Sequence, residues 1–445
     1  MKTGFSKICI TPPYGTPITG YFAPRYTKGV IDNLYARAVA FNDGKKNAAI
    51  LALDLCNLGK EYCDNIKEAI TKVADIDADA IFINCSHTHT GPLVGEDESL
   101  GAKTDESYVK TLIESARDAV LYAIDDLKES RIEVAQGKAE NISFCRRYRM
   151  KDGSVATNPG VNNPEIDHAL GTPNETVKLV KIIREGAKDI FMVSFGTHSD
   201  SVGGEYISAD YIGFVCDILE NAVPDTNCIF IQGIQGDVNH VNVNPTKGES
   251  AISVIDFDSV PRSIKHAEHM GRIIAGAVLS VCSITEEVKA DKLSYGVLRV
   301  DLPSYQQNHR LEEARKIHEL YTAGRANELP YKEMELTTVV AEAERIIKLE
   351  NGPDFYSFFL SAVGIGDLVF VGIGGEVFTD IGNRILEKSP FKNTVACALT
   401  NGDNGYVPTA KAYDEGGYEA RSSHLKPGGD DIIVEGTVKL LNSIK

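Results

Sequence analysis

The sequence predicts a single interwoven α/β unit, on three observations. Residues 47–55 and 80–85 are apolar and strand-like, and 60–73 between them has a helical pattern, which gives the β-α-β order of α/β folds. Residues 176–184 and 189–195 flank a short turn containing glycine, which predicts a β-hairpin. No long flexible linker divides the chain. We therefore expect one domain over all 445 residues.

The remaining elements follow in the same alternating order. Periodicity predicts further helices at about 105–127, 209–221, 262–281, 378–387 and 430–441. It predicts further strands at about 228–232, 355–363, 368–373 and 394–399. Residues 141–173 are rich in Asn, Pro, Gly and Arg, and we expect a long loop there. Residues 308–350 are rich in charge and helix-patterned, which predicts a helical hairpin inserted within the 1–445 domain, on its surface.

Composition and charge exclude several classes of partner. With 46 Lys and Arg against 63 Asp and Glu, the net charge is −17, which disfavours nucleic-acid and anionic membrane surfaces. No apolar run reaches the length of a membrane span, and the first residues lack the apolar core of a signal peptide. The nine cysteines include no Cys-x-x-Cys pair, which indicates reduced thiols. We expect a cytoplasmic protein whose partner is a small-molecule substrate.

The segment Ser86-His87-Thr88-His89-Thr90-Gly91-Pro92 follows the apolar strand at 80–85. At strand periodicity, residues i and i+2 point to the same side, so both imidazoles are expected to face one site. Histidine is the commonest metal ligand and a general base near neutral pH. The alternative is that one histidine is capped by local hydroxyl groups and the other is solvated.

Three more polar residues follow predicted strands: His198, Glu376 and Tyr406. Imidazoles, a carboxylate and a phenolate suit a hard-to-borderline dication, most simply Zn²⁺ with an open coordination position. Such an ion turns water into a nucleophile at neutral pH. The competing motifs fail, because Gly372-x-Gly374-Gly375 is an incomplete dinucleotide fingerprint and the chain has neither a Walker loop nor a Gly-x-Ser-x-Gly elbow.

Over nearly its whole length the chain resembles the catalytic domain of the neutral/alkaline (non-lysosomal) ceramidase family of zinc amidohydrolases. The matching motifs, in order, are Ile10-Thr11-Pro12-Pro13, His87-Thr88-His89-Thr90-Gly91-Pro92, Gly196-Thr197-His198, Gln235-Gly236-Asp237-Val238, Gly374-Gly375-Glu376 and Gly405-Tyr406-Val407-Pro408-Thr409. The resemblance implies an α/β catalytic domain with one large mixed sheet. We expect no C-terminal β-sandwich domain of the kind that family members carry.

The resemblance also implies roles for individual residues. The zinc ligands of the family fall on His87, His198, Glu376 and Tyr406. His89 falls on a histidine beside the metal, Tyr418 on a tyrosine that contacts the reacting centre, and Arg147 on an active-site arginine.

The chain departs from the family after Gly236-Asp237-Val238, where Asn239-His240 replace a serine and a proline. The Asn239 amide offers both a donor and an acceptor, which favours a compact substrate with polar groups near the scissile bond. We therefore expect a zinc-dependent hydrolase that attacks an amide, ester or lactone carbonyl of a small polar substrate. The alternatives are a true ceramidase (N-acylsphingosine amidohydrolase), a hydrolase of carbohydrates or cyclic polyols, and a non-catalytic metal- or ligand-binding protein. The oligomeric state stays open.

Overall fold

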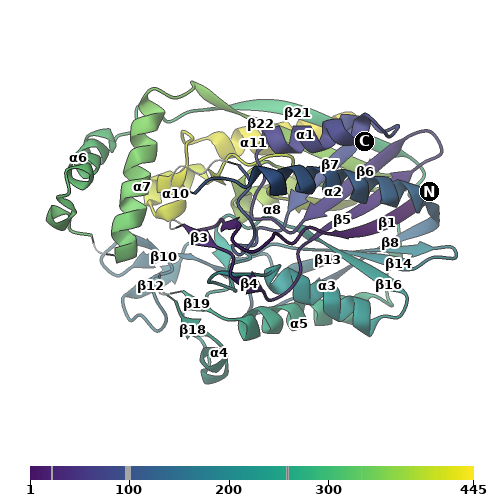
Figure 1. The fold of residues 1–445 in the computed structure, drawn as a ribbon, viewed down its shortest axis with the longest axis horizontal. Coiled ribbons are helices and arrows are strands. Elements are labelled where there is room, and N and C mark those ends of the chain that lie inside the picture. The colour runs from purple at the N-terminus through teal and green to yellow at the C-terminus, as the bar shows by residue number, and fades with distance from the viewer. Residues whose placement is uncertain (22–23, 96–101, 257, 259, 332) are drawn as a thin grey trace.

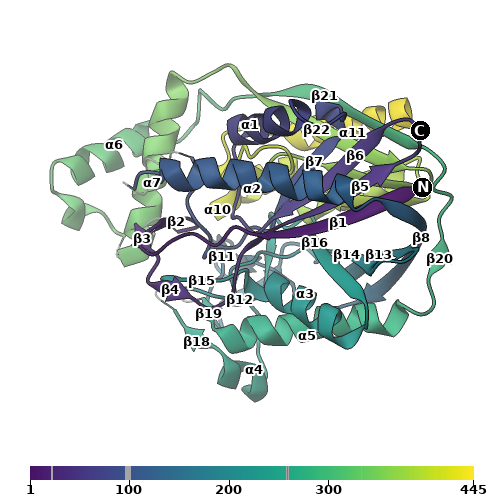
Figure 2. The same cartoon turned by 45° about the vertical axis from the view of Figure 1, so that its right-hand side comes forward.

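The fold is that of a computed structural model, which describes residues 1–445 except 22–23, 96–101, 257, 259 and 332. Two sheets lie at its centre, with helices packed on the outside (Figures 1 and 2). Both termini lie at one end of the molecule, and helices α6 and α7 lie at the other. Among the helices that the structure describes, none combines the length and apolar composition that a membrane crossing requires.

The larger sheet is mixed, as the resemblance predicted. Its main path runs β16 (Thr226–Gln232), β14 (Asp189–Phe195), β13 (Thr176–Arg184), β8 (Lys128–Lys138), β1 (Lys2–Cys9), β5 (Tyr35–Asn42), β6 (Asn47–Leu53) and β7 (Ile81–Cys85), with β20 (Glu286–Glu287) also paired to β8. The outermost pairs, β14–β16 and β6–β7, are parallel, and the pairs between them are antiparallel. The predicted hairpin is present as β13 and β14.

The second sheet contains β21 (Leu293–Pro303), β22 (Phe355–Ile365), β23 (Leu368–Gly372) and β25 (Asn393–Cys397). It meets the first sheet where β7 and β25 end, because the Cys85 amide donates to the Leu399 carbonyl at 3.1 Å and the Asn84 side chain donates to the Ala398 carbonyl at 2.8 Å. Beyond this junction, β24 (Glu376–Val377) pairs in parallel with β26 (Tyr406–Val407). The polar residues that follow separate strands are therefore brought together.

Amphipathic helices cover both sheets. The longest is α2, which Asp105 caps by accepting from the amides of Ser107 and Tyr108, and its apolar face contacts β1 and β5. Its buried residues belong to the main apolar core together with those of β5, β6 and β7. The helices of this layer are α1 (Lys60–Thr71), α2 (Glu106–Asp125), α3 (Asp210–Ala222), α5 (Ile264–Val281), α8 (Thr379–Lys388) and α11 (Gly429–Ile444).

The prediction of a long loop at 141–173 is wrong in part. Short strands form there: β9 (Phe144–Cys145), β10 (Arg147–Met150), β11 (Val155–Thr157) and β12 (Ile166–Ala169). The last three make an antiparallel sheet in the order β11-β10-β12. Strands of two to four residues, separated by Asn, Pro and Gly, are too short to give a readable alternation of apolar and polar positions.

Two helices occupy the region where a helical hairpin was expected, α6 (Leu311–Thr322) and α7 (Glu333–Glu350). The remaining short elements are β2 (Pro17–Ile18), β3 (Arg25–Tyr26), β4 (Gly29–Val30), β15 (Tyr206–Ile207), β17 (Val238–Asn239), α4 (Lys247–Ile252), β18 (Val254–Ile255), β19 (Pro261–Arg262), α9 (Ala410–Glu415), α10 (Tyr418–Ser422) and the 3₁₀ turns Ala78–Ala80 and Ala326–Glu328.

Candidate metal centre and active-site pocket

Two buried histidines turn the same ring nitrogen toward one carboxylate. His87 Nδ1 lies 2.9 Å from the Cys56 carbonyl oxygen, and His198 Nδ1 lies 2.9 Å from that of Gln235. A carbonyl oxygen only accepts, so each Nδ1 carries the hydrogen and each Nε2 presents a lone pair. Both Nε2 atoms point at Glu376 Oε2, at 3.3 Å from His87 and 3.1 Å from His198.

This arrangement fits a divalent metal ion. His198 Nε2 and Glu376 Oε2 are buried and have no hydrogen-bond partner. Acceptor atoms that face one another in a dry interior repel unless a proton or a cation lies between them. Two neutral imidazoles and a carboxylate are a donor set typical of zinc, and the carbonyl oxygens on Nδ1 are the usual support for histidine ligands. We conclude that His87, His198 and Glu376 suit a zinc-type ion.

The pKa values of His198 and Glu376 agree with these ligand states. Burial lowers the pKa of His198 to about 4, so its ring is neutral. Burial alone would raise the pKa of Glu376, but the two histidines hold it well below its usual range. Burial also lowers the pKa of His87, yet Cys56 and Glu376 together raise it well above its ordinary value. Without a bound cation, His87 therefore carries a second ring proton, and a metal ion would take the place of that proton.

Two tyrosines lie beside the cluster. Tyr406 is directly opposite Glu376 in the β24–β26 pair, and its ring centroid lies 5.6 Å from that of Tyr418. Arg146 Nη2 donates to the Tyr406 hydroxyl at 3.0 Å. Burial raises the pKa of Tyr406, and the positive charge of Arg146 opposes that rise. The structure thus gathers both tyrosines near Glu376, while the assignment of Tyr406 as a ligand stays a prediction.

The arginine that faces the pocket is Arg146 and not its neighbour. Arg146 donates to Glu419 at 2.6 Å and to the Gly236 carbonyl at 3.0 Å, besides Tyr406. Arg147, the residue named from the sequence, points elsewhere and donates to the Gly416 carbonyl at 2.8 Å and to Glu415 at 3.2 Å. Successive residues of an extended chain project to opposite sides, so Arg146 and Arg147 enter different environments, and a catalytic role for Arg147 stays a prediction.

His89 joins the cluster on its open side. Its Nε2 lies 3.3 Å from His87 Nε2, and its Nδ1 lies 3.7 Å from Asp200 Oδ1. Burial lowers the pKa of His89 well below its ordinary value. Asp200 is fixed by Arg262, with Nη2 to Oδ2 at 2.7 Å, and by the Tyr21 hydroxyl at 2.6 Å. Asp200 follows the Gly196-Thr197-His198 motif by two residues, but no sequence pattern predicted a role for it.

His87 and His89 face one site, but not through strand periodicity. Strand β7 ends at Cys85, and His87 has a left-handed backbone with φ of 66°. The predicted convergence of the two rings is correct, while the predicted reason for it is wrong. Hydrogen bonds hold this bend, because the His87 amide donates to the Leu55 carbonyl at 2.8 Å and the His89 amide to that of Ser199 at 3.1 Å.

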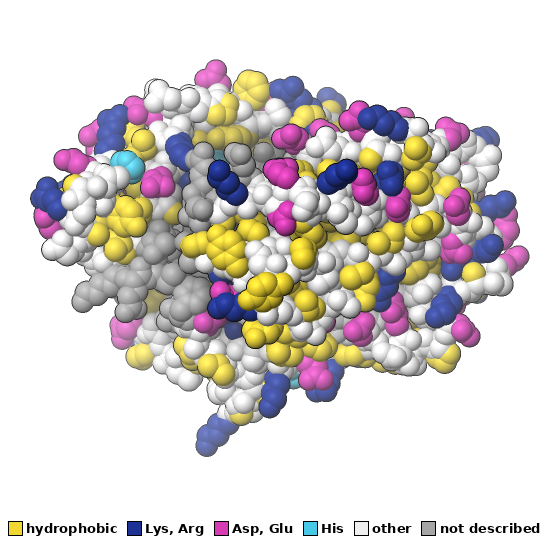
Figure 3. Space-filling model, in the orientation of Figure 1, with side chains coloured by type: hydrophobic (Ala, Val, Ile, Leu, Met, Phe, Trp, Pro, Cys, Tyr) yellow, Lys and Arg dark blue, Asp and Glu magenta, His cyan; other side chains and the backbone are white. Residues whose placement is uncertain are grey.

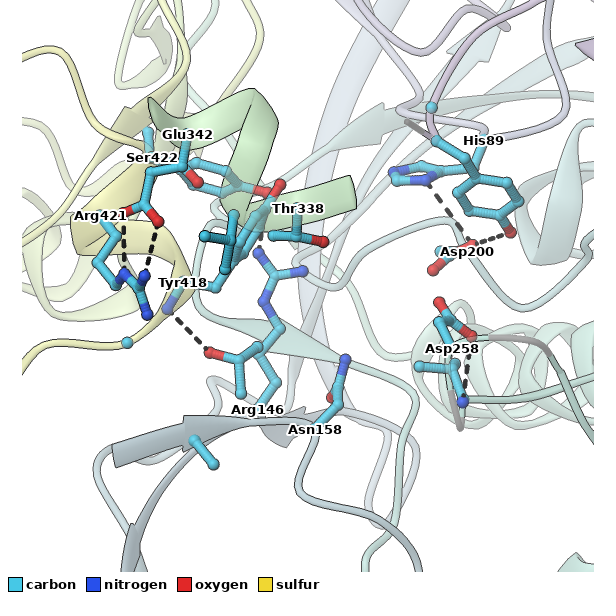
Figure 4. A pocket seen from close by; sticks show the side chains of 18 of the residues that line it. His89, Arg146, Asn158, Asp200, Asp258, Thr338, Glu342, Tyr418, Arg421 and Ser422 are labelled. Atoms are coloured by element: carbon cyan, nitrogen blue, oxygen red, sulfur yellow. Dashed lines mark hydrogen bonds and ion pairs between the residues drawn. The ribbon is translucent and has the colours of Figure 1, made fainter. Parts of the chain in front are cut away.

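A cavity of about 490 Å³ lies beside the cluster, and it is lined by His89 and Tyr406 but not by His87, His198 or Glu376 themselves (Figure 4). Among the residues that line it are His89, Arg146, Asn158, Asp200, Asp258, Glu342, Tyr406, Tyr418 and Arg421. The cavity is of the size that holds small organic ligands. Asn239 is buried, is not among the lining residues, and donates from its amide to Asn158 at 2.9 Å. Its predicted contact with substrate would therefore be indirect, through Asn158.

Comparisons with known proteins agree with this architecture. No protein-family model matches the sequence, and no curated protein matches it. The structure is similar to neutral ceramidase from Pseudomonas aeruginosa, with a TM-score of 0.71 and 17% identity over 100% of this chain and 75% of that one. It is also similar to a ceramidase complexed with C2, with a TM-score of 0.73 and 16% identity over 99% of this chain and 74% of that one. The chain therefore has the α/β fold of the neutral ceramidases, as the sequence motifs predicted.

Proposed function

We propose that this chain is a zinc-dependent hydrolase that attacks the carbonyl group of a small polar amide, ester or lactone. The observation that supports it most is the convergence of two imidazole Nε2 atoms and one carboxylate oxygen beside a cavity. The likeness to ceramidases supports a hydrolase on the same fold. His87, His198, Glu376 and Tyr406 would hold the ion.

The reaction divides between the ion and the chain. Bound zinc supplies a Lewis acid that polarises a carbonyl group and activates water. His89, kept neutral by its lowered pKa, is placed to accept a proton from the attacking water and to return it to the leaving group. Arg146 and Tyr418 line the cavity beside Tyr406, where they would donate hydrogen bonds to the oxyanion of the tetrahedral intermediate.

A second candidate is ceramide hydrolysis itself, which the structural likeness to two ceramidases favours. The lining of the cavity argues for a more polar substrate. Charged groups stand on both sides of it, Asp200 and Asp258 on one and Glu342 and Arg421 on the other (Figure 4). Arg262, which also lines the cavity, pairs with both aspartates. These groups pair with one another, but an alkyl chain along such walls would cover their exposed parts, such as the Arg421 side chain, and would offer no hydrogen bond in place of water.

Chelation followed by restoration of the metal tests the proposal. The enzyme should hydrolyse members of a panel of short N-acyl compounds, esters and sugar lactones, lose that activity to a chelator, and regain it with zinc. Turnover that survives complete removal of metal would refute the metal-dependent mechanism. A protein that carries zinc but turns over no member of the panel and no ceramide would instead support the non-catalytic alternative.

A further inference from the structure

Helix α7 forms one wall of the active-site cavity. Thr338, Val339 and Glu342 all line it, and the helix passes beside the residues of the site in Figure 4. The helices α6 and α7 pack on each other through a small apolar core of their own. The hairpin is therefore a distinct piece of structure at the end of the molecule away from the termini (Figures 1 and 2). Its helix α7 supplies part of the lining of the pocket.

A buried ion pair fastens this wall to helix α10, which also carries Tyr418. Glu342 is 4% exposed and accepts from Arg421 Nε at 2.8 Å and from Nη2 at 2.7 Å. Arg310 of the hairpin also donates to Glu342. Arg345 Nη2 adds a hydrogen bond to Ser422 Oγ at 3.2 Å. The charged pair Glu342–Arg421 thus lies on one side of the cavity, and His89 lies on the other (Figure 4).

The helical repeat of α7 determines which of its side chains line the cavity. Val339 and Glu342 are three residues apart and share the side of α7 that lines the cavity. Val340 and Ala343 share the next side and, like Val339, belong to the core between the helices, but neither of them lines the cavity. The chain therefore offers two adjacent valines with the same side chain, of which one touches the cavity and the other does not.

We infer that α7 is the specificity-determining wall of the site, and that it selects a compact substrate whose end distant from the scissile bond carries a hydroxyl group. This inference rests on the proposed function, since it places the scissile bond at the metal centre. Glu342 is already buried and paired, but the Arg421 side chain is 38% exposed, and an alkyl chain that reached α7 would cover it without offering a hydrogen bond in place of water. A hydroxyl group at the same point would hydrogen-bond to the pair, and Val339 would limit the length of either chain.

Binding of straight-chain hydroxamic acids tests the inference without turnover. The hydroxamate group anchors at the metal, so chain length sets how near the far end comes to α7. Calorimetry on the zinc-loaded protein should show affinity rising up to about fourfold per methylene group, and then falling once the chain meets the wall. At that length, the ligand with a terminal hydroxyl should bind at least about fivefold more tightly than the plain alkyl ligand.

The two valines supply the matched variants. Val339→Ala should let a chain one or two carbons longer bind before affinity falls, while Val340→Ala should leave that length unchanged. A continuous rise in affinity to long alkyl chains, or an equal change in both variants, would contradict the inference that α7 sets the specificity of the site. A protein that binds no hydroxamate of any length would overturn the proposed metal site, and the inference with it.

Discussion

At the scale of single residues, the site depends on how each histidine is held rather than on which residues are present. Backbone carbonyls fix the Nδ1–H tautomer of His87 and His198, which turns both Nε2 lone pairs inward. The motifs around His87 and His198 do not predict which tautomer each ring adopts, because the carbonyls that fix it belong to other segments, at Cys56, Gln235 and Val238.

Two adjacent arginines give a direct test of the residue assignments. Arg146→Met should lower kcat by about 10²–10³-fold, because it removes a donor to the oxyanion and a partner of Tyr406. Arg147→Met should leave kcat within about threefold of wild type, although both variants lose a buried ion pair and should both unfold at lower temperature. Steady-state kinetics and thermal melts check this, and equal losses of kcat in the two variants would contradict the assignment.

At the scale of elements, the centre of the site is assembled by short segments that follow long strands. The β24–β26 pair is only two residues long on each side, yet it sets Glu376 against Tyr406. The turn that ends in Val238 supplies carbonyl oxygens to His198 and is tied to the start of α8, where Asp237 accepts from the Thr379 amide at 2.7 Å.

The central strand β13 carries a lysine whose titration should be visible in stability. Burial lowers the pKa of Lys178 to about 8, although its amine donates to the Thr394 carbonyl. Between about pH 8 and its ordinary pKa near 10.4, the unfolded chain binds more protons here, so this group makes stability rise with pH. The free energy of unfolding of wild type should therefore rise relative to Lys178→Met between pH 7.5 and 10, the range over which we would measure it.

The control variant is Lys181→Met, because Lys181 lies on the same strand and also donates to a backbone carbonyl, that of Cys282, at 3.0 Å. Denaturant unfolding at several pH values gives the differences, in which groups common to both proteins cancel. A constant difference between wild type and Lys178→Met across this range would show that Lys178 titrates normally.

At the scale of the whole molecule, the sequence predicted the long elements and the candidate ligands but not how the sheets meet. The hairpin at 176–195 and helix α2 carry strong periodicity, and both are present. The junction of β7 and β25 depends on the left-handed backbone of Leu399 and Asn401, with φ of 47° and 54°, which no apolar pattern reports. Which of Arg146 and Arg147 faces the cavity depends on the exact register of the short strand β10, and the position of Asp200 depends on its partners Arg262 and Tyr21, and the apolar pattern reports neither.

The shape and charge of the pocket predict a narrow range of substrates. A fluorescent long-chain ceramide should be hydrolysed far more slowly than the best member of a panel of short N-acyl compounds, esters and sugar lactones. In a cavity of about 490 Å³ with charged groups on both sides, an alkyl tail would cover partly exposed charges such as Arg421 without hydrogen-bonding to them. Efficient turnover of ceramide, with none of the polar panel, would restore ceramidase activity as the better description.

Metal content is the most direct test of the central claim. Elemental analysis of protein purified without added metal should find about one zinc ion per chain, and His87→Ala/His198→Ala should reduce it to about a tenth or less. The control is His240→Ala/His266→Ala, a second pair of buried histidines with ring centroids 5.0 Å apart, which should keep its zinc. Wild type without any transition metal, or full zinc in the His87/His198 variant, would contradict the account.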